Sequence, residues 1–496
     1  MPDPAVKRNC FWRPYLLLIL FSIVIFIYGP LLKKHYALDT YVTEAYGNQA
    51  EQQIQLGRFL SGAILKLFTA LGVNTAVDQI YSTFPSLCFL ALSIYLLIRL
   101  FFGLREEWDR KSFLLLCLSC VVSLCNVFML HWFLFPEVTI FMTAGLLLSI
   151  SAVLLLRDSG VARWILCYLL LLAAVSFYQA VGAFFVTFGM LYIALRRAGQ
   201  STSSTLKGFV AVFIVYVLAG ATNLLFIKWH GQPETRTDFQ HTNPFRNISG
   251  IIGSIQDKLQ NTNLGVAPFY AFSLFMVCLL ICCGLLLWKS PDRKGLSKQL
   301  FLLTVLIIGS FLSTIAPHLL TSTVDVSPRS IAALMSLPGV ISLFVLLGLP
   351  LLKKPFSLYL LLVFLSVFFC VNTYISYRVE MSRFATNRLD KELAGMVYQE
   401  ILRQEKETGQ AVSRIAFRHD EAPVLCYPGL VCYGNFRAMG RDWTIVPLMS
   451  IVSGRKFTET GMSEKIYDSL FKGKNWDSFS QEQVVIQDDI LYLMLY

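Results

Sequence analysis

Long apolar runs separated by short polar connections fill the first 375 residues of the chain. A run of about 20 apolar residues can cross the ~30 Å hydrocarbon core of a bilayer as a helix. Eleven runs fit this description and are predicted to be membrane spans. They lie at residues 14–30, 82–103, 113–130, 138–156, 164–176, 180–195, 208–228, 266–287, 300–320, 330–348 and 357–375. The fifth and sixth are predicted to be two short or tilted helices that meet at a polar break.

The composition supports a membrane protein. Of the 496 residues, 55% are hydrophobic and 15% are charged, whereas a soluble chain carries roughly 25% charge. This composition excludes a water-soluble enzyme with one core, and it also excludes a disordered chain.

The net charge of +11 is unevenly distributed. The first 375 residues hold 27 basic and 15 acidic side chains, while residues 376–496 hold 15 basic and 16 acidic ones. Lys and Arg collect in the cytoplasmic loops of membrane proteins, so the basic excess predicts loops near a membrane and no nucleic-acid partner.

Basic residues in alternate connections predict the orientation. With the N-terminus in the cytoplasm, the inner segments hold 17 Lys and Arg in 61 residues, against 8 in 107 for the outer segments. The difference places residues 376–496 outside the cytoplasm. A cleaved signal peptide is not expected at the first run, because no small-residue cleavage site follows it.

The longest outer connection, residues 31–81, carries the richest polar pattern. Asp39 follows the first span by nine positions, and Gly57-Arg58 opens a stretch to Leu71 with apolar residues at helical spacing. This spacing predicts an amphipathic helix that lies along the membrane surface.

Other polar residues fall on the same predicted face: Glu137 after the third span, the break Tyr178-Gln179, and Arg329 before the tenth span. Polar groups retained at a membrane face invite a functional interpretation. Each also has a structural alternative. The acids can cap helices, the arginines can anchor at headgroups, and Tyr178 can be an interfacial aromatic.

Residues 376–496 alternate short apolar runs with turn residues after a charged helical stretch, which predicts a small α/β or α+β domain. Trp443 and Trp476 are candidate sugar contacts, with buried packing as the alternative. Cys426 and Cys432 are a candidate disulfide if this region faces an oxidising compartment. No cluster has metal-ligand spacing, so no metal site is predicted.

Taken in order, Asp39, Gly57-Arg58, the Tyr178-Gln179 break and the outer C-terminal region resemble the bacterial glucosyltransferase II family of integral membrane enzymes. The resemblance covers roughly the first 350 residues. It implies a GT-C-like fold, with residues 1–375 as the catalytic domain and 376–496 as a periplasmic domain in the bacterial inner membrane. Where relatives carry paired acids, this chain has Asp39 followed by Thr40. The sequence therefore does not decide whether a divalent cation binds there.

The resemblance also implies an activity and its partners. The donor would be polyprenyl-phosphate glucose, and the acceptor a lipid-linked or polymeric surface glycan such as O-antigen. A companion flippase and a polyprenyl-phosphate glucosyl synthase would supply the donor, as in serotype conversion. No organic cofactor is implied.

The residues support an inverting mechanism. Asp39 is the expected base, and Glu137 is the alternate base or a partner for a sugar hydroxyl. Arg58 and Arg329 are expected to bind the leaving phosphate. Tyr178, Gln179, Trp443 and Trp476 are the candidates for sugar contacts.

Two other classes of function are compatible with a polytopic chain. An O-antigen polymerase or ligase would also act on polyprenyl-linked glycans, although it would carry a large loop between spans. A lipid-linked glycan transporter or flippase would show charged pairs within spans and internal repeats, and neither is found in this sequence.

Overall fold

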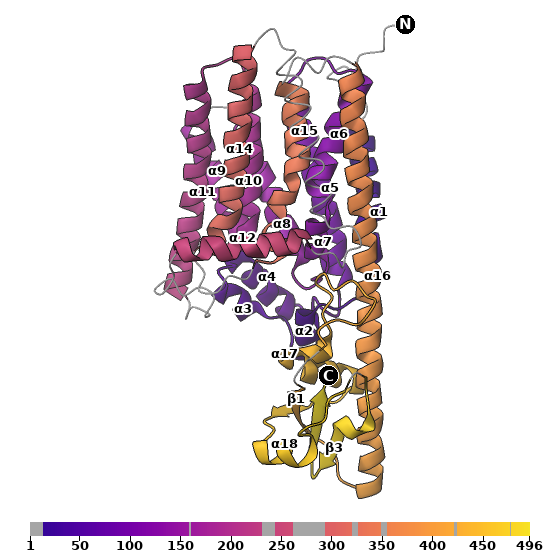
Figure 1. The fold of residues 1–496 in the computed structure, drawn as a ribbon. Helices are drawn as coiled ribbons and strands as arrows, with labels where there is room; N and C mark the ends of the chain where they lie inside the picture. Colours follow the sequence, from indigo (N-terminus) through magenta and orange to yellow (C-terminus); the bar gives the residue numbers. More distant parts are fainter. Residues whose placement is uncertain are drawn as a thin grey trace.

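The computed structural model describes residues 13–157, 160–230, 244–260, 293–319, 326–348, 355–420, 424–476 and 478–496. It consists of a bundle of apolar helices, a group of short helices at one end of the bundle, and a small sheet beyond them (Figure 1). The predicted span at residues 266–287 lies outside the described residues.

The bundle is built from apolar helices that pack side by side. Their bounds are α1 Arg13–Tyr28, α5 Ile80–Phe102, α6 Arg110–Leu124, α7 Val127–Phe133, α8 Thr139–Leu155, α9 Val161–Phe177, α10 Gly182–Arg196, α11 Thr202–His230, α14 Arg293–Leu319, α15 Leu337–Gly348 and α16 Pro355–Thr408. Short 3₁₀ turns, η1 Gly29–Leu32, η2 Gln179–Val181, η5 Pro328–Ser330 and η6 Ala332–Ser336, connect or extend them.

Six of the described helical segments are long and apolar enough to cross a membrane, or seven if the bent pair α6 and α7 is one span. The predicted spans at residues 138–156, 164–176 and 330–348 coincide with shorter apolar helices of 10–17 residues. The chain is therefore a helical membrane protein, and the number eleven stays a prediction.

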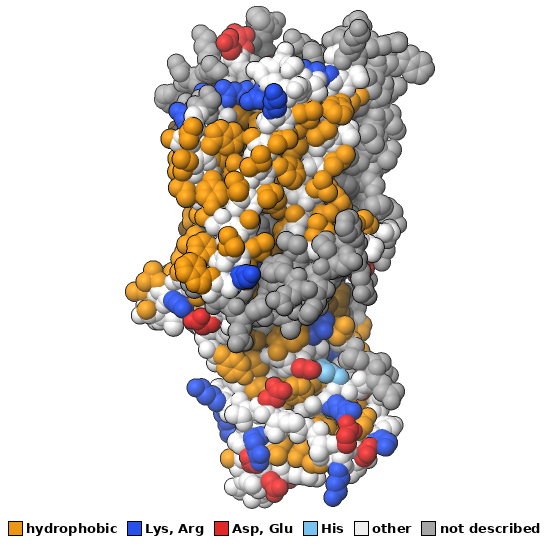
Figure 2. Space-filling model, turned by 90° about the vertical axis from the view of Figure 1, so that its left-hand side faces the viewer, with side chains coloured by type: hydrophobic (Ala, Val, Ile, Leu, Met, Phe, Trp, Pro, Cys, Tyr) orange, Lys and Arg blue, Asp and Glu red, His pale blue; other side chains and the backbone are white. Residues whose placement is uncertain are grey.

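The surface has the charge pattern of a membrane protein. On the face shown in Figure 2, an apolar belt covers the bundle, and Lys and Arg side chains gather at the end of the belt that lies away from the sheet. Basic side chains also hold segments of the chain together. Arg105 donates to the carbonyl of Leu346, and Lys298 donates to that of Ala198.

The short helices α2 Leu38–Tyr46, α3 Ala50–Gln55 and α4 Phe59–Ala70 cover the other end of the bundle. Helix α4 lies where the amphipathic helix was predicted, and Ser61 donates a hydrogen bond to the Phe177 carbonyl at 2.9 Å. A further amphipathic helix, α12 Pro244–Gln260, crosses the bundle (Figure 1) and buries Ile251 and Ile255.

Helix α16 connects the bundle to the sheet without a break (Figure 1). Its 54 residues span about 80 Å at 1.5 Å per residue, far more than the ~30 Å hydrocarbon core. The predicted domain boundary after residue 375 therefore falls inside this helix.

The C-terminal region contains a four-stranded sheet with the order β2-β1-β4-β3. Strand β1 Arg414–His419 pairs in parallel with β2 Thr458–Thr460 and β4 Ile490–Leu495, while β3 Val484–Gln487 is antiparallel to β4. The remaining elements are α17 Asp442–Ser453, α18 Glu464–Leu470, η8 Ala438–Gly440 and η9 Gln481–Gln483.

The C-terminal region packs against the connection formed by residues 31–81. Tyr36 and Tyr41, whose rings stack at 4.6 Å, belong to the same buried cluster as Leu393 of α16 and Ile445 of α17. This packing places α17 over α2, and it creates the site described next.

Candidate functional site

A cavity of about 1400 Å³ lies between the end of the bundle and the C-terminal region. Helices α2 and α3, the connection from α7 to α8, η5, and α17 with its preceding loop all contribute to its walls. Its lining includes five of the predicted site residues: Asp39, Arg58, Glu137, Arg329 and Trp443.

Glu137 lies in the connection between α7 and α8 and is only 4% exposed. Its Oε2 accepts a 2.7 Å hydrogen bond from the hydroxyl of Thr40, in the first turn of α2. The Thr40 oxygen in turn accepts from the backbone N–H of Ala37 at 2.9 Å. Because a hydroxyl donates only once, this arrangement directs the Thr40 proton to Glu137.

Burial raises the pKa of Glu137 from 4.5 to about 7, and the negative charge of Asp39 adds to the rise. The hydrogen bond from Thr40 and the charge of Arg329 act in the opposite direction. Glu137 is therefore partly protonated at neutral pH, and a pKa raised in this way is typical of carboxyl groups at functional sites.

Asp39 has a different environment. It is exposed within the cavity wall and lies in the first turn of α2. The partial positive charge at a helix N-terminus stabilises a negative charge there. Asp39 and the buried Glu137 thus interact electrostatically within the cavity.

Arg58 is positioned by the turn between α3 and α4. Gly57 has φ +76°, a conformation that side chains with a Cβ rarely adopt. An added Cβ would clash with Ile227 of α11 and would lie 3.0 Å from the Gln179 amide nitrogen. The Arg58 guanidinium lies 4.9 Å from the Tyr178 ring centre and donates to Gln53 Oε1 at 3.0 Å.

Tyr178 and Gln179 therefore lie behind Arg58 in the structure. Tyr178 is buried, with 4% exposure. Gln179 donates from its side-chain amide to the Leu56 carbonyl at 2.7 Å, and Asn223 of α11 donates to the Gly57 carbonyl at 2.9 Å. These contacts hold the turn that carries Arg58.

Arg329 enters the cavity from η5, which Pro328 opens. Its guanidinium lies 4.0 Å from the Phe135 ring centre. The indole N–H of buried Trp132 donates to the Arg329 carbonyl at 2.8 Å, and the Trp132 ring meets Tyr178 edge to face at 6.0 Å. Trp132 thus contacts the backbone of Arg329 and also Tyr178, whose ring lies against the Arg58 guanidinium.

The bend between α6 and α7 places His131 at the cavity wall and Trp132 in its buried contacts with Arg329 and Tyr178. The two helices meet at 54°, and the Asn126 side chain caps α7 by accepting from the N–H groups of Phe128 and Met129. The Tyr28 hydroxyl donates to the Asn126 carbonyl at 3.0 Å. This cap interrupts an otherwise apolar segment.

Trp443 is 52% exposed and lines the cavity from the first turn of α17. Trp476 belongs instead to a small cluster on the sheet, where its ring lies 6.4 Å from that of Phe471. The structure therefore brings only one of the two candidate tryptophans to the cavity.

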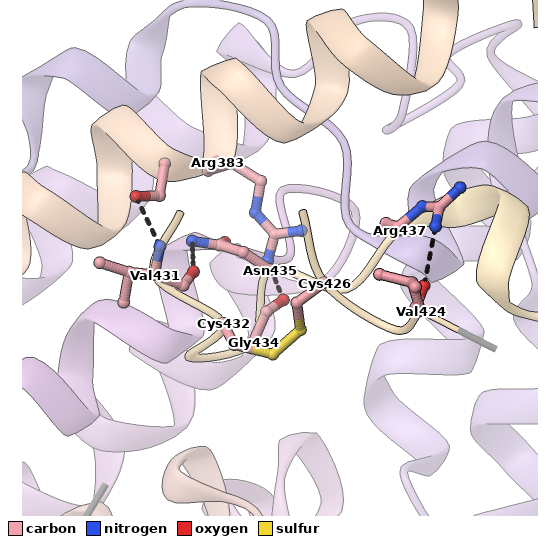
Figure 3. The surroundings of a disulfide bond; sticks show 9 residues. Arg383, Val424, Cys426, Val431, Cys432, Gly434, Asn435 and Arg437 are labelled. Carbon is pink, nitrogen blue, oxygen red and sulfur yellow. Dashed lines mark hydrogen bonds between the residues drawn. A yellow bond between two sulfur atoms is a disulfide. The ribbon is translucent and has the colours of Figure 1, made fainter. Parts of the chain in front are cut away.

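A disulfide joins Cys426 and Cys432, and Cys432 lines the cavity. Beside it, buried Arg383 of α16 donates to the Gly434 carbonyl at 2.6 Å (Figure 3) and to the Tyr36 carbonyl at 3.0 Å. This single guanidinium connects α16, the connection formed by residues 31–81 and the loop around Gly434 at the cavity wall.

Several residues that line or support the cavity carry no signal in the sequence. Buried Thr40 and Arg383 support its walls: Thr40 binds a residue 97 positions away, and Arg383 reaches backbone groups 347 and 51 positions away. His131 and Arg441 line the cavity itself. Isolated polar residues of these types have no fixed spacing that would mark them in advance.

Within the part of the chain that the structure describes, no three His, Cys, Asp or Glu side chains are grouped closely enough to hold a metal ion.

Apolar helices of membrane length, with a cavity that combines carboxyl and guanidinium groups, define a polytopic membrane protein with an enzyme-like site. Residues 29–370 match the family described as glucosyl transferase GtrII, and the chain belongs to this family. This confirms the resemblance and makes the protein a membrane glucosyltransferase. Searches of curated proteins and of solved structures found no match.

Proposed function

We propose that this protein is a GT-C-like enzyme that transfers glucose from polyprenyl-phosphate glucose to a lipid-linked or polymeric surface glycan, as in O-antigen modification. The observation that carries the proposal is the convergence of Asp39, Arg58, Glu137 and Arg329 in one cavity. These residues come from four separate segments, all within the family match.

The reaction needs one base, because the departing phosphate is a stable anion. In the proposed step, the acceptor hydroxyl oxygen attacks the anomeric carbon from the face opposite the phosphate. The bond between that carbon and the phosphate oxygen breaks, and its electron pair leaves with the polyprenyl phosphate. The hydroxyl proton passes to Asp39, and the anomeric configuration is inverted.

Asp39 is the better base of the two acids because it faces the open cavity. Glu137 is buried and partly protonated at neutral pH, so it is suited to hold a hydroxyl of the transferred sugar. Its Oε1 has no hydrogen-bond partner among the described residues. A sugar hydroxyl would satisfy this atom, since unpaired buried polar groups are costly.

Arg58 and Arg329 are proposed to bind the phosphate. Negative charge accumulates there as the bond breaks, and cationic groups fixed in advance stabilise that charge more than the ground state. The aromatic rings under both guanidinium groups restrict their motion. Tyr178 and Gln179 contribute by supporting Arg58, and Trp443 is proposed to stack on an acceptor sugar.

The basic end of the apolar belt supports an orientation with the N-terminus in the cytoplasm. The cavity and residues 376–496 would then face the periplasm of a bacterial inner membrane. A reporter enzyme fused after residue 496 would test this orientation, and activity of a cytoplasm-specific reporter there would contradict it.

The function is tested by comparing the composition of the surface polysaccharide in cells with and without the protein. We expect loss of a glucose side branch when the protein is absent. Altered glycan chain length with unchanged glucose content would contradict the proposal and favour the polymerase.

A further inference from the structure

One wall of the cavity is formed by residues inside the family match, and the other by residues outside it. One wall comes from residues 38–138 and 327–329, inside the matched region 29–370. The other contains nine lining residues between Cys432 and Glu459, all beyond the match. The residues proposed above for the transfer chemistry, Asp39, Arg58, Glu137 and Arg329, all line the matched wall. The second wall is therefore available for binding the acceptor.

We propose that residues 432–459 select the acceptor, and that they recognise a glycan segment of more than one sugar through Arg441 and Trp443. The inference rests on the proposed function and names the substrate class of the same site. It extends the role of Trp443 from a sugar contact to one member of a selective surface.

The side chains of this wall are suited to neutral sugars. The exposed Trp443 ring offers a flat apolar face for the C–H side of a pyranose. The Arg441 guanidinium lies 5.9 Å from that ring and 5.3 Å from the Phe436 ring, and its buried Nε has no hydrogen-bond partner among the described residues. It can donate to sugar hydroxyls, while the exposed carboxylate of Glu459 can accept from them.

The wall is held rigidly before any ligand binds. Arg383 and the Cys426–Cys432 disulfide fix its loop, and Asn435 donates to the Val379 carbonyl at 2.9 Å. Gly434 has φ +71°, and a Cβ there would lie 2.5 Å from His131 Nε2. The two walls therefore meet closely, and such preorganisation reduces the entropic cost of binding.

The size of the cavity indicates the length of the acceptor. Its volume is about 1400 Å³, which exceeds the ~300–1,000 Å³ of pockets that hold drug-sized ligands. After the glucosyl phosphate of the donor is placed against Arg58 and Arg329, space remains for more than one sugar along the second wall.

The test uses the purified full chain in vesicles with labelled polyprenyl-phosphate glucose. The acceptors are the lipid-linked surface glycan isolated from the host cells and the free monosaccharides released from it by acid hydrolysis. We expect Trp443→Ala and Arg441→Ala each to raise KM for the glycan by roughly tenfold or more. We expect KM for the donor to change much less, and the free monosaccharides to be poor acceptors.

Arg418→Ala is the matched control. Arg418 also lies over an aromatic ring, 4.1 Å from the centre of Tyr467, but it does not line the cavity. It should leave KM for the glycan unchanged.

An unchanged glycan KM in both variants, or an equal rise in the KM of donor and glycan, would overturn the inference while the transferase activity stands. Efficient use of free monosaccharides would overturn the proposed acceptor length. If the unaltered protein consumes no labelled donor, the proposed function itself fails.

Discussion

Thr40 donates its hydroxyl proton to Oε2 of Glu137 at 2.7 Å, linking the first turn of α2 to the connection between α7 and α8. The Ala37 N–H occupies the Thr40 oxygen from the other side. This pair fixes the buried carboxyl group at the wall of the cavity, and its consequences can be measured.

The protonation of Glu137 should respond to its two neighbours in opposite directions. Thr40→Val removes a hydrogen bond that lowers the pKa, so we expect the pKa of Glu137 to rise above about 7. Asp39→Asn removes a repulsive charge, so we expect that pKa to fall. Infrared titration of the protonated carboxyl band measures both, with Glu137→Gln identifying the band. Shifts in the same direction would contradict the geometry.

Glu137 should also make stability depend on pH. Its pKa in the folded protein, about 7, exceeds its ordinary value of 4.5, so the folded state holds the proton more tightly. Its contribution is therefore fully present below pH 4.5 and is lost as pH rises to about 7. The shift corresponds to about 3 kcal/mol. Thermal unfolding of Glu137→Gln should show a smaller decline across this range, and an identical decline would contradict the assignment.

Arg58→Lys and Arg329→Lys should each raise KM for the donor by roughly tenfold or more, because Lys cannot reproduce a two-point grip on phosphate. Arg388→Lys is the control, since Arg388 is exposed and forms an ion pair with Glu392 one turn along α16. If the donor KM values equal that of the control, both arginines anchor the protein at lipid headgroups and do not bind the donor phosphate.

Gly57→Ala should impair activity more than its backbone strain explains. The strain at positive φ is roughly 1–2 kcal/mol for a residue with a Cβ, and the clash with Ile227 adds to it. Gly72→Ala has a similar φ of +74° but meets nothing within 4 Å, so it isolates the strain. Unfolding and transfer measurements that give equal losses for the two variants would exclude a special role for the Gly57 turn.

Cys426 and Cys432 should resist alkylation until a reductant is added. A disulfide across so short a loop stabilises by about 2 kcal/mol in the chain-entropy model, so Cys426→Ser should lower the unfolding temperature. Transfer to the glycan should fall more than donor binding, because Cys432 and Gly434 line the second wall. Alkylation of both thiols in the native protein without reductant would contradict this expectation.

The sequence predicted much of the architecture because long apolar runs have few structural solutions in a membrane. Helix α4 and a charged helical stretch after residue 375 followed from spacing, whereas the unbroken continuation of the last apolar run into that stretch was not predicted. Helix α12 was not predicted. Its isoleucines have amphipathic spacing, at Ile248, Ile251, Ile252 and Ile255. The prediction for this connection rested only on its charged residues.

The candidate site was predicted in part. Asp39, Arg58, Glu137 and Arg329 were found because charged residues are rare in the apolar region and stand out at its edges. Thr40, Trp132 and Arg383 were not, since their roles depend on contacts with residues far away in the sequence. Trp443 and Trp476 were both predicted to contact sugars. Trp443 lines the cavity, whereas Trp476 packs on the sheet, and the residue type alone does not distinguish these two environments.

The central claim is that the cavity transfers glucose with Asp39 as the base. The most direct measurement is the rate at which purified protein in vesicles transfers labelled glucose from polyprenyl-phosphate glucose to the glycan, compared with the folded Asp39→Asn variant. We predict transfer by the unaltered protein and a loss of about 10²-fold or more in the variant. An unchanged rate in Asp39→Asn would contradict the account.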